Sequence, residues 1–596
     1  MLVSEAIGAA LAGLGADTVF GVVGSGNFHV TNALVAHGAR FVAARHENGA
    51  ACMADGWARL AGRPGILSVH QGPGLTNAIT GITEAAKSRT PLLVLAADVA
   101  AAAVRSNFRI DVASLATAVG ATPERLHSPE TAVADLTRAY ATADRERRTV
   151  VLALPLDVQA GSCDGPGLAA GQPAAVPGTI AASVTGATAI TDGAPPAETV
   201  ELLATALARA RRPVFIAGRG ARHGGAGPAL SRLAAGCGAL LATSAAAKGL
   251  FRGDPWDLDV SGGFATPLAA ELIRDADLVV GWGCALNMWT LRHGQLIGPD
   301  ATVVQVDHER SALGAHRPVD LAVLGDCAAT AEATAAALDK LRGWAWPASG
   351  ETAGPDTAAE AGLLAGPLAG PPGPDAAAGY RTAEVAARIA AEGRWRDVPY
   401  EDDGDERHID PRTLSIGLDD LLPAERVVAI DSGNFMGYPS MFLSVPDADG
   451  FSFTQAYQSI GLGLASAIGG AIARPDRLTV AALGDGGALM GVSELETAVR
   501  LGLGMVIVIY DDEAYGAEVH HFGPDGHPLD TVRFPPADIA AIGRGFGCDA
   551  LTVRGPDDLA PVRDWLTGPR SAPLVIDAKV TSHRGSWWLE EAFRGH

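Results

Sequence analysis

One stretch near the C-terminal end, residues 484–516, constrains the fold more than any other. It begins with GDGG directly after the short apolar run 478–483, and a second apolar run, 505–510, lies within it. Each run has the length of one buried strand. The residues between the runs predict a helix, with a Ser493–Glu496 capping box at its start. Strand, glycine turn, helix and strand in this order predict a parallel βαβ unit.

Two acidic residues follow these predicted strands, Asp485 after the first and Asp512 after the second. The carboxyl ends of adjacent parallel strands meet at one edge of a sheet, which is where open α/β sheets bind ligands. Glycine at Gly484, Gly486 and Gly487 lets the backbone approach a ligand closely. Two carboxylates beside glycine amides suit a hard cation such as magnesium that holds a phosphate. The alternative from these residues alone is a plain turn followed by a solvated acidic loop.

The composition excludes several classes of protein. A length of 596 residues predicts about three or four domains, and a hydrophobic content of 48% indicates a globular chain. No apolar run reaches membrane-spanning length, and residues 1–16 lack the basic start of a signal peptide. The net charge of −22 argues against nucleic acid and membrane as partners. The six cysteines lack CxxC spacing, which favours reduced thiols, a cytoplasmic location and no zinc site.

Two stretches rich in Ala, Gly and Pro predict linkers, residues 161–196 and 346–395. They divide the chain into domains at 1–160, 197–345 and 396–596. In each domain apolar strand patterns alternate with helix patterns, so we expect an α/β protein with three Rossmann-like parallel-sheet domains. The predicted strands are 18–23, 65–70 and 92–97 in the first domain, 213–218, 239–243, 278–283 and 302–307 in the second, and 426–431 with 478–483 and 505–510 in the third.

GDG followed about 25 residues later by the polar pair Asp511-Asp512 resembles the cofactor motif of enzymes that depend on thiamine diphosphate (ThDP). The group that it resembles contains acetolactate synthase and benzoylformate decarboxylase. In that family the motif ends with two asparagines, and this chain departs by carrying two aspartates. The resemblance implies ThDP as cofactor, with Mg²⁺ held by Asp485, Asp512 and the Ala514 carbonyl. It also implies that the three domains bind the pyrimidine ring, form a middle domain and bind the diphosphate, in that order.

The resemblance implies further cofactor contacts in the third domain. Ile460 is similar to the bulky residue that wedges between the two rings of the bent cofactor, although a buried isoleucine at a helix start would have the same sequence. The other implied contacts are Gly433, Asn434 and Phe435 after the strand 426–431, the glycines Gly484, Gly486 and Gly487, and Tyr515 and Gly516.

Glu47 opens a predicted helix in the first domain. His46-Glu47 is not the start of an HExxH metal site, because position 50 is alanine, and the residues alone favour a surface glutamate at a helix start. The ThDP family carries a catalytic glutamate here, followed by a GPG turn such as Gly72-Pro73-Gly74. By resemblance Glu47 hydrogen-bonds the aminopyrimidine ring, and Gly72, Pro73 and Asn77 contact the cofactor. A carboxyl at the ring nitrogen favours the imino tautomer, which can remove the proton of the thiazolium carbon.

His70 and Gln71 precede the GPG turn, at a strand end that faces the same edge. We expect both to be catalytic, since a histidine there can shuttle protons and relatives that decarboxylate aromatic 2-keto acids carry one. The alternative is a histidine packed against the loop. Expected substrate contacts are Ser25, His29, His520 and His521.

The resemblance implies a transferase or lyase that decarboxylates a 2-keto acid and then joins the product to an acceptor, as acetolactate synthase does. The alternatives are a non-oxidative decarboxylase similar to benzoylformate decarboxylase and a catalytically silent cofactor-binding paralogue, against which Glu47 argues. The middle domain lacks a proper GxGxxG, yet the acetolactate synthase branch often binds FAD there, so FAD stays open as a second cofactor. A homodimer or homotetramer is expected, with the active site at a subunit interface.

Overall fold

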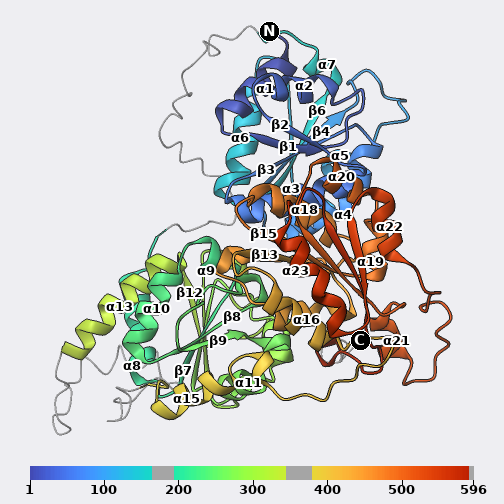
Figure 1. Cartoon of the computed structure of the whole chain (residues 1–596). Coiled ribbons are helices and arrows are strands. Elements are labelled where there is room, and N and C mark those ends of the chain that lie inside the picture. The colour runs from blue at the N-terminus through green and yellow to red at the C-terminus, as the bar shows by residue number, and fades with distance from the viewer. Residues whose placement is uncertain (164–192, 344–378, 590–596) are drawn as a thin grey trace. The chain divides into compact units, whose positions relative to one another are not determined.

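The computed structural model describes residues 1–163, 193–343 and 379–589. These residues form two compact units. Unit 1 contains the described residues of Met1–Ser183, Asp402–Pro439 and Ser452–Ser586, and unit 2 contains those of Val184–Glu401, Ser440–Phe451 and Trp587–His596. Each unit is built on parallel sheets with helices between successive strands, in blue and in orange to red for unit 1 and in green to yellow for unit 2 (Figure 1).

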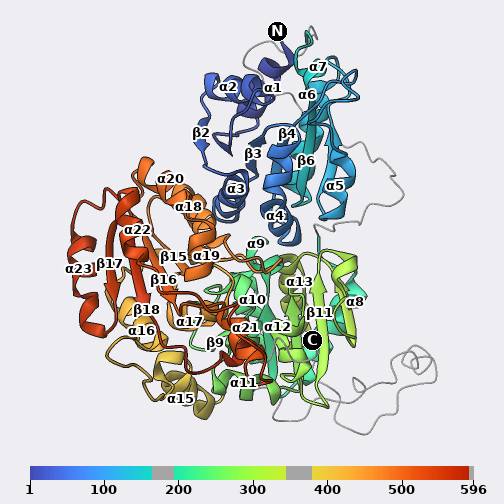
Figure 2. The same ribbon diagram turned by 90° about the vertical axis from the view of Figure 1, so that its right-hand side faces the viewer.

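The first sheet of unit 1 has six parallel strands in the order β2-β1-β3-β4-β6-β5. Its strands are β1 Thr18–Gly21, β2 Arg40–Ala43, β3 Gly65–Val69, β4 Leu92–Asp98, β5 Thr122–Arg125 and β6 Thr149–Pro155. Its helices are α1 Val3–Gly13, α2 Phe28–Ala36, α3 Glu47–Ala61, α4 Pro73–Lys87, α5 Val112–Ala118, α6 Ala132–Arg145 and α7 Leu156–Gln159. Helices α1, α2 and α6 share a core with one face of the sheet, and α3, α4 and α5 share a core with the other (Figure 2).

The other sheet of unit 1 comes from the C-terminal part of the chain, and we call it the third sheet. Its order is β14-β13-β15-β16-β18-β17, again with every pair of its long strands parallel. The strands are β13 Arg426–Ile430, β14 Phe451–Phe453, β15 Leu478–Gly484, β16 Val506–Asp511, β17 Asp549–Val553 and β18 Leu574–Lys579. The helices are α16 Pro411–Leu421, α17 Gly437–Phe442, α18 Gly463–Ala473, α19 Asp485–Met490, α20 Glu494–Arg500, α21 Gly516–Phe522, α22 Ile539–Phe546 and α23 Ala560–Thr567.

Two helices join the two halves of unit 1. Helix α3 of the first half and α18 of the third-sheet half are rich in alanine and glycine, and their side chains belong to one hydrophobic core. A Cβ atom at Gly56 would overlap the Ser466 carbonyl oxygen, and a Cβ atom at Gly469 would overlap the Met53 carbonyl oxygen. The two backbones can approach this closely because each helix presents a glycine at the crossing.

Unit 2 contains the middle sheet, in the order β12-β11-β10-β7-β8-β9. This is the strand order of doubly wound dinucleotide-binding folds. The strands are β7 Pro213–Ala217, β8 Leu240–Thr243, β9 Asp257–Val260, β10 Leu278–Trp282, β11 Thr302–Asp307 and β12 Leu321–Leu324. The helices are α8 Ala197–Arg209, α9 Arg219–His223, α10 Gly227–Cys237, α11 Pro267–Arg274, α12 Met288–Leu291, α13 Cys327–Gly343 and α15 Ala383–Glu392.

Three all-parallel sheets confirm the predicted α/β class. Helix α15 falls inside the predicted linker 346–395, and Tyr380 and Val385 belong to the core of the middle sheet. Residues 164–192 and 344–378, which hold most of both predicted linkers, lie outside the described residues. The domain boundaries therefore stay a prediction.

The local prediction for the GDGG stretch needs two corrections. A short helix, α19, begins at Asp485 itself, so the glycines form the first turn of a helix and not only a loop. The expected Ser493–Glu496 capping box is wrong, because the Ser493 side chain makes no cap hydrogen bond at the start of α20. Glu496 instead forms ion pairs with Arg45 and Arg500. Ser493 itself has helical backbone angles, φ −59° and ψ −26°, so its hydroxyl is not placed as an N-cap.

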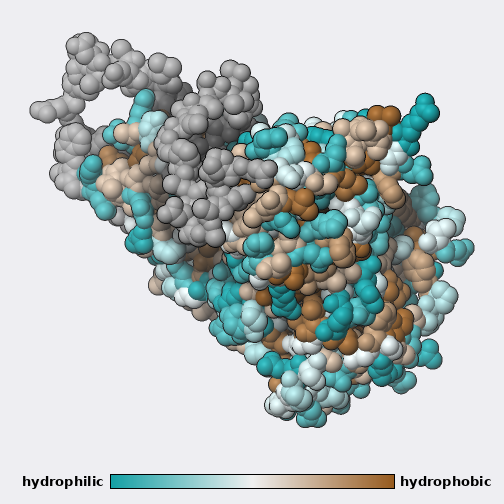
Figure 3. Space-filling view, turned by 90° about the horizontal axis from the view of Figure 1, so that it is seen from above, coloured by the Kyte–Doolittle hydropathy of each residue, from teal (hydrophilic) through white to brown (hydrophobic). Residues whose placement is uncertain are grey.

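Hydrophobic and hydrophilic residues are interspersed over the described part of the face shown in Figure 3. None of the helices in the described ranges combines the length and the apolar character needed to cross a bilayer.

Candidate active site

Glycine residues at the ends of β13 and β15 form a cradle without side chains. Gly433 has φ +139° and ψ 180°, a backbone conformation that is essentially confined to glycine. A Cβ atom at Gly486 would lie 2.7 Å from the Tyr515 ring, and one at Gly487 would overlap the Asp431 carboxylate. A Cβ atom at Gly484 would lie 3.1 Å from the Phe435 ring. These three positions favour glycine because the side chains of Tyr515, Asp431 and Phe435 pack directly against the backbone there.

Asp485 and Asp512 lie at this cradle with no counter-charge. Asp485 is 8% exposed, and neither carboxylate forms an ion pair with any described cation. Burial and then the charges of Asp512 and Asp511 raise the pKa of Asp485 to about 8. Burial, with a smaller contribution from Asp511, raises the pKa of Asp512 to about 7. A buried and a half-buried carboxylate of this kind provide a ready site for a divalent cation, whose charge would remove their mutual repulsion.

The neighbouring Asp511 has a different role from Asp512. Its side chain is buried and forms an ion pair with Lys579, which also pairs with Asp577 at 3.3 Å. The carboxylate of Asp511 is thus neutralised inside the sheet, between β16 and β18. Asp512 instead accepts a hydrogen bond from Asn434, which directly follows the cradle residue Gly433.

Asn434 is oriented by a residue that the sequence reasoning missed. Its Nδ2 donates to Asp512 Oδ2 at 3.4 Å, and Ser586 donates to both the Asn434 side-chain oxygen and its carbonyl oxygen, the latter at 2.8 Å. Gly516 leaves the necessary space, because a Cβ atom there would overlap the Asp512 carboxylate and lie 2.8 Å from Asn434 Nδ2. Ser586 is far from any motif, so no sequence signal indicated it.

Ala514, the expected carbonyl ligand, forms an isolated antiparallel bridge with Arg533. The bonds of this bridge run between flanking groups: Tyr515 N–H donates to the Val532 carbonyl at 2.8 Å, and Phe534 N–H donates to the Glu513 carbonyl at 2.9 Å. Neither bond uses the Ala514 carbonyl. Within the described ranges, no group of three or more His, Cys, Asp or Glu side chains is arranged to hold a metal. A metal here would take two carboxylates and complete its shell with other oxygens.

Ile460 lies beside Gly487 and is held there by Asp431. The Ile460 Cγ2 atom is 3.1 Å from the position of a Cβ atom on Gly487. Asp431 accepts from Gly461 N–H at 2.9 Å and from Leu462 N–H at 3.2 Å, ahead of α18. Burial raises the pKa of Asp431 to about 6 in spite of these bonds. The half-buried Ile460 precedes the helix, as the resemblance implies for the residue under the bent cofactor.

Phe435 fills the space beneath the cradle. Its ring stacks on Tyr510 with centroids 5.3 Å apart. The Tyr438 ring also stacks on Tyr510, with centroids 6.4 Å apart. Burial raises the pKa of Tyr438 to about 12. Phe435 therefore supports the glycine backbone from below and contributes no polar contact.

Glu47 is the first residue of α3 and is half-buried. Asn77 Nδ2 donates to Glu47 Oε2 at 3.0 Å, so the two residues that the resemblance placed on the cofactor contact each other. The GPG turn before Asn77 depends on Gly72, which has φ +63° and would bring a Cβ atom to 2.7 Å from the Phe108 carbonyl oxygen. Pro73 opens helix α4 directly after this turn.

His70 has a defined orientation at the end of β3. Its Nδ1 accepts a hydrogen bond from Gly26 N–H at 3.1 Å, so the neutral ring carries its proton on Nε2. The Phe108 ring contacts it edge to face, with centroids 5.3 Å apart. The adjacent Gln71 is buried, and its Oε1 has no hydrogen-bond partner among the described residues. A buried acceptor without a partner is costly and is expected where a ligand completes the site.

The expected substrate contacts are spread over two places. Ser25 and His29 are exposed on the loop and helix after β1. His520 and His521 lie on α21, and the His521 ring contacts Phe522 edge to face at 4.6 Å. The role of these four residues stays a prediction.

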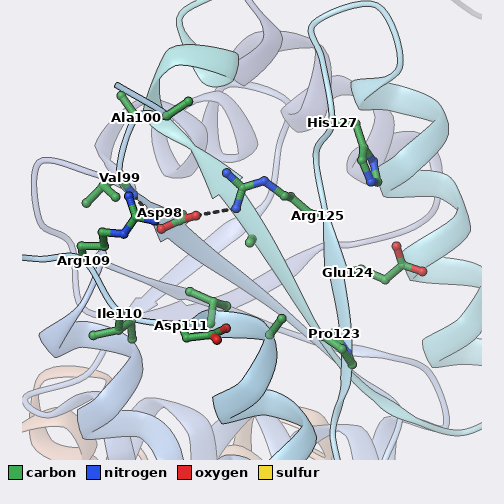
Figure 4. Close-up of a pocket in the computed structure, with 14 residues that line it drawn as sticks. Asp98, Val99, Ala100, Arg109, Ile110, Asp111, Pro123, Glu124, Arg125 and His127 are labelled. Carbon is green, nitrogen blue, oxygen red and sulfur yellow. Dashed lines mark hydrogen bonds and ion pairs between the residues drawn. The ribbon is translucent and has the colours of Figure 1, made fainter. Parts of the chain in front are cut away.

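The described residues of unit 1 line several polar or mixed cavities, of which two lie near strand ends. One of about 300 Å³ is lined by Asp485, Gly486 and Tyr515, next to the cradle. The other, of about 880 Å³, lies at the ends of β4 and β5. Figure 4 shows Arg109 and Arg125 on either side of Asp98, with the Arg125–Asp98 ion pair at 2.6 Å. This second cavity is polar and lies outside the predicted site residues.

These features belong to one protein family. Residues 1–116 match the N-terminal thiamine pyrophosphate binding domain of thiamine pyrophosphate enzymes, residues 200–334 match their central domain, and residues 431–578 match their C-terminal binding domain. Thiamine pyrophosphate is another name for ThDP. The chain therefore belongs to the ThDP-dependent enzymes, which confirms the resemblance seen in the sequence.

Curated relatives cover almost the whole chain. A probable 2-ketoarginine decarboxylase of Pseudomonas aeruginosa is 30% identical over 573 residues, 94% of this chain and 90% of the relative. The large subunit of acetolactate synthase isozyme 2 of Escherichia coli is 26% identical over 587 residues, 97% of this chain and 96% of the relative. A sulfoacetaldehyde acetyltransferase of Castellaniella defragrans is 25% identical over 593 residues, 94% of this chain and 90% of the relative.

Proposed function

We propose that this chain cleaves or forms a C–C bond next to a carbonyl, by decarboxylating a 2-keto acid and joining the product to an acceptor. One observation carries the proposal: the buried Asp485 and the half-buried Asp512 lie at the glycine cradle, and neither forms an ion pair with a described cation. This donor set fits a divalent metal that in turn holds a diphosphate. The family membership and the names of the relatives support the same reaction class.

The proposed cofactor site uses residues of both halves, which meet across the proposed subunit interface. Asp485, Asp512 and the Ala514 carbonyl would hold Mg²⁺, and the amides of Gly433 and Gly486 would face the diphosphate. Ile460 would support the bent cofactor, and Glu47 would meet its pyrimidine ring. When bound, ThDP supplies a carbon nucleophile that attacks the substrate carbonyl and accepts the electron pair of the broken bond.

The protein's own groups then have defined tasks. Glu47 holds a proton at the pyrimidine ring, and the 3.0 Å bond from Asn77 fixes which carboxylate oxygen remains to do so. His70 presents Nε2–H as a donor, because its Nδ1 is occupied by Gly26 N–H. Gln71 Oε1 offers an unpaired acceptor at the same strand end. Together they can orient a carbonyl substrate and deliver a proton to the reacting carbon.

A second candidate is a non-oxidative 2-keto acid decarboxylase, in which a proton and not a carbon acceptor ends the reaction. The fixed Nε2–H of His70 favours it, since this group is a ready proton donor. The probable 2-ketoarginine decarboxylase among the relatives supports the same reading. A catalytically silent paralogue is disfavoured by the Glu47–Asn77 pair.

We extend the proposal to a cytoplasmic homodimer or homotetramer with the active site at a subunit interface. The six cysteines are all free and buried, which fits a reducing compartment. FAD binding by the middle sheet also stays a prediction. Its switch point between β7 and β10 is tightly packed, because a Cβ atom at Gly220 would lie 2.8 Å from Gly283 Cα. Visible absorbance of the purified protein tests for a bound flavin.

The test is a screen of 2-keto acids with ThDP and Mg²⁺ that follows CO₂ release and coupled products in the same reactions. Carboligation predicts a coupled product in proportion to CO₂ when an aldehyde or keto acid acceptor is present. Simple decarboxylation predicts CO₂ with the free aldehyde only. Absence of any ThDP-dependent turnover, while ThDP binds, would support the silent paralogue and contradict the proposal.

A further inference from the structure

Two buried glutamates in unit 1 have matching places in the first and third sheets. Glu84 lies on α4, the helix that follows β3, and is 1% exposed. Glu494 lies on α20, which follows β15 after the short α19, and is 2% exposed. Since the two sheets share one strand order, β3 and β15 are equivalent strands, and the two glutamates occupy equivalent helices.

Each glutamate binds backbone of the opposite half. Glu494 accepts from Arg45 N–H at 3.1 Å and from His46 N–H at 3.0 Å. Glu84 accepts from Tyr457 N–H at 2.7 Å and from Ala456 N–H at 3.2 Å. These are the segments that lead from β2 into α3 and from β14 into α18.

Both bound segments end at a residue of the proposed cofactor site. His46 directly precedes Glu47, and Tyr457 lies three residues before Ile460. A carboxylate that accepts two successive amides holds the local backbone more firmly than one bond would, because charged acceptors make the stronger hydrogen bonds. The glutamate of each half therefore controls the segment that carries the key residue of the other.

The surroundings leave little freedom for either carboxylate. Glu494 Oε2 also accepts from the Thr497 hydroxyl at 2.7 Å, and a Cβ atom at Gly49 would overlap Glu494 Oε1. Glu84 is bonded by Arg59 at 2.9 Å and by Ser88 at 2.8 Å. Arg59 itself donates to the Phe453 carbonyl at 2.8 Å. This bond is a third hydrogen bond to the segment that Glu84 holds through the Ala456 and Tyr457 amides.

Each glutamate together with the two backbone amides that it binds is called a clamp here, and the two clamps differ in charge. Glu84 has Arg59 as a counter-ion, whereas Glu494 forms no ion pair with a described cation and is held by amides and one hydroxyl alone. Arg45 contributes only its amide to Glu494, because its side chain pairs with Glu496. The position of the Arg45 and His46 amides thus depends on the Glu494 carboxylate itself.

We propose that Glu494 and Glu84 are positioning residues that act reciprocally: Glu494 sets the place of Glu47, and Glu84 sets the place of Ile460. The inference rests on the proposed function for the roles of Glu47 and Ile460. The contacts themselves do not depend on that function, so a part of the test needs no substrate.

The first measurement is hydrogen–deuterium exchange of the cofactor-free protein. Glu494→Gln should speed exchange of the Arg45 and His46 amides and leave those of Ala456 and Tyr457 unchanged. Glu84→Gln should show the opposite pattern. Glu496→Gln is the matched control, since it lies on the same helix and pairs with the side chains of Arg45 and Arg500 but with neither the Arg45 nor the His46 amide, and it should change neither. If exchange changes equally at both segments, or at neither, the reciprocal clamp is wrong.

The second measurement is kinetic. In Glu494→Gln we expect kcat to fall about 10- to 100-fold, the usual cost of a small misplacement of a catalytic group, with KM and ThDP affinity nearly unchanged. In a Glu47→Gln background the same change should have no further effect on kcat, because Glu494 acts through Glu47. A full additional loss in that background would contradict the proposal. Thr497→Val, which removes one bond to the carboxylate, should give a smaller change of the same kind if Glu494→Gln folds poorly.

Failure of the proposed function gives a different result. If the wild-type protein binds no ThDP, the kinetic part has no signal, and the crossed exchange pattern alone decides whether the clamps exist. If the wild type is active and the exchange pattern is absent, the clamps are refuted and the proposed function stands.

Discussion

The first and third sheets of unit 1 have the same strand order but different chemistry at their strand ends. Read along each sheet, β2-β1-β3-β4-β6-β5 corresponds strand for strand to β14-β13-β15-β16-β18-β17. The end of β15 carries the unneutralised Asp485, whereas the equivalent end of β3 carries His70 and Gln71. One half thus offers charge for a metal, and the other offers hydrogen-bonding groups for a ring and a carbonyl.

The packing between these halves repeats as the topology does. Gly56 of α3 contacts Ser466 of α18, and Gly469 of α18 contacts Met53 of α3. On each helix the glycine and the residue that contacts the other helix's glycine lie three positions apart. The middle sheet has a different order and a tightly packed switch point. The comparison indicates that topology and packing are shared between the two halves, while the residues at the strand ends assign each half its task.

The largest expected effect comes from removing the Asp485 carboxylate at the end of the third-sheet strand β15. Asp485→Ala should abolish ThDP binding at concentrations that saturate the wild type, because the metal loses one of its two carboxylates. Asp512→Asn is the matched control and should retain binding, since an amide oxygen can still coordinate. Calorimetric titration of ThDP into metal-stripped protein, with and without Mg²⁺, measures both. Equally tight binding without metal would show that these acids are not the anchor.

The first half is tested by Glu47→Gln. This variant should bind ThDP normally and lose about 10²–10⁴-fold in turnover, because an amide cannot hold the proton at the pyrimidine ring. The measurement is kcat together with ThDP affinity on the same preparation. Near-normal turnover with any accepted substrate would remove Glu47 from the mechanism.

The shared packing is tested by Gly56→Ala. The new Cβ atom would overlap the Ser466 carbonyl oxygen, so the backbones must separate, and we expect a loss of about 1–3 kcal/mol in unfolding free energy. Gly13→Ala in α1 is the control, since no atom lies within 4 Å of its Cβ position and a small gain is expected there. Thermal or denaturant unfolding compares the two. Similar behaviour of both variants would contradict the close crossing of α3 and α18.

The smallest expected effect is a pH dependence of folding stability caused by Asp485 and Asp512. The pKa values of Asp485, about 8, and Asp512, about 7, lie above the usual range of an aspartate. The folded metal-free protein therefore holds protons that the unfolded chain has released, and its stability should fall as pH rises from about 4 to about 8.

Metal binding needs both carboxylates charged, so uptake of Mg²⁺ with ThDP near pH 7 should release protons. Calorimetry in buffers of different ionisation enthalpy measures this release, and Asp485→Asn should reduce it. A binding enthalpy that is independent of the buffer would show that the two acids are already ionised in the metal-free protein.

Much of the local structure at the candidate site was predictable because its signals are local. The GDGG turn, the paired acids and the GPG turn are short patterns in which glycine or a carboxylate is required at a given position. Helix α3 was expected to start near Glu47, and it does. The capping box failed because Ser493 has helical backbone angles and Glu496 pairs with Arg500 and with the remote Arg45. Ser586 was missed for the same reason, since its partner Asn434 is remote in the sequence.

The sequence by itself determined the α/β class, the family and the strand ends at which the proposed cofactor residues lie. These follow from apolar runs and glycine positions that depend on neighbouring residues only. The tertiary structure decided which member of the pair Asp511-Asp512 is neutralised by Lys579, which nitrogen of His70 carries the proton, and that Glu84 and Glu494 bind backbone of the opposite half. Each of these depends on contacts between segments that only folding brings together.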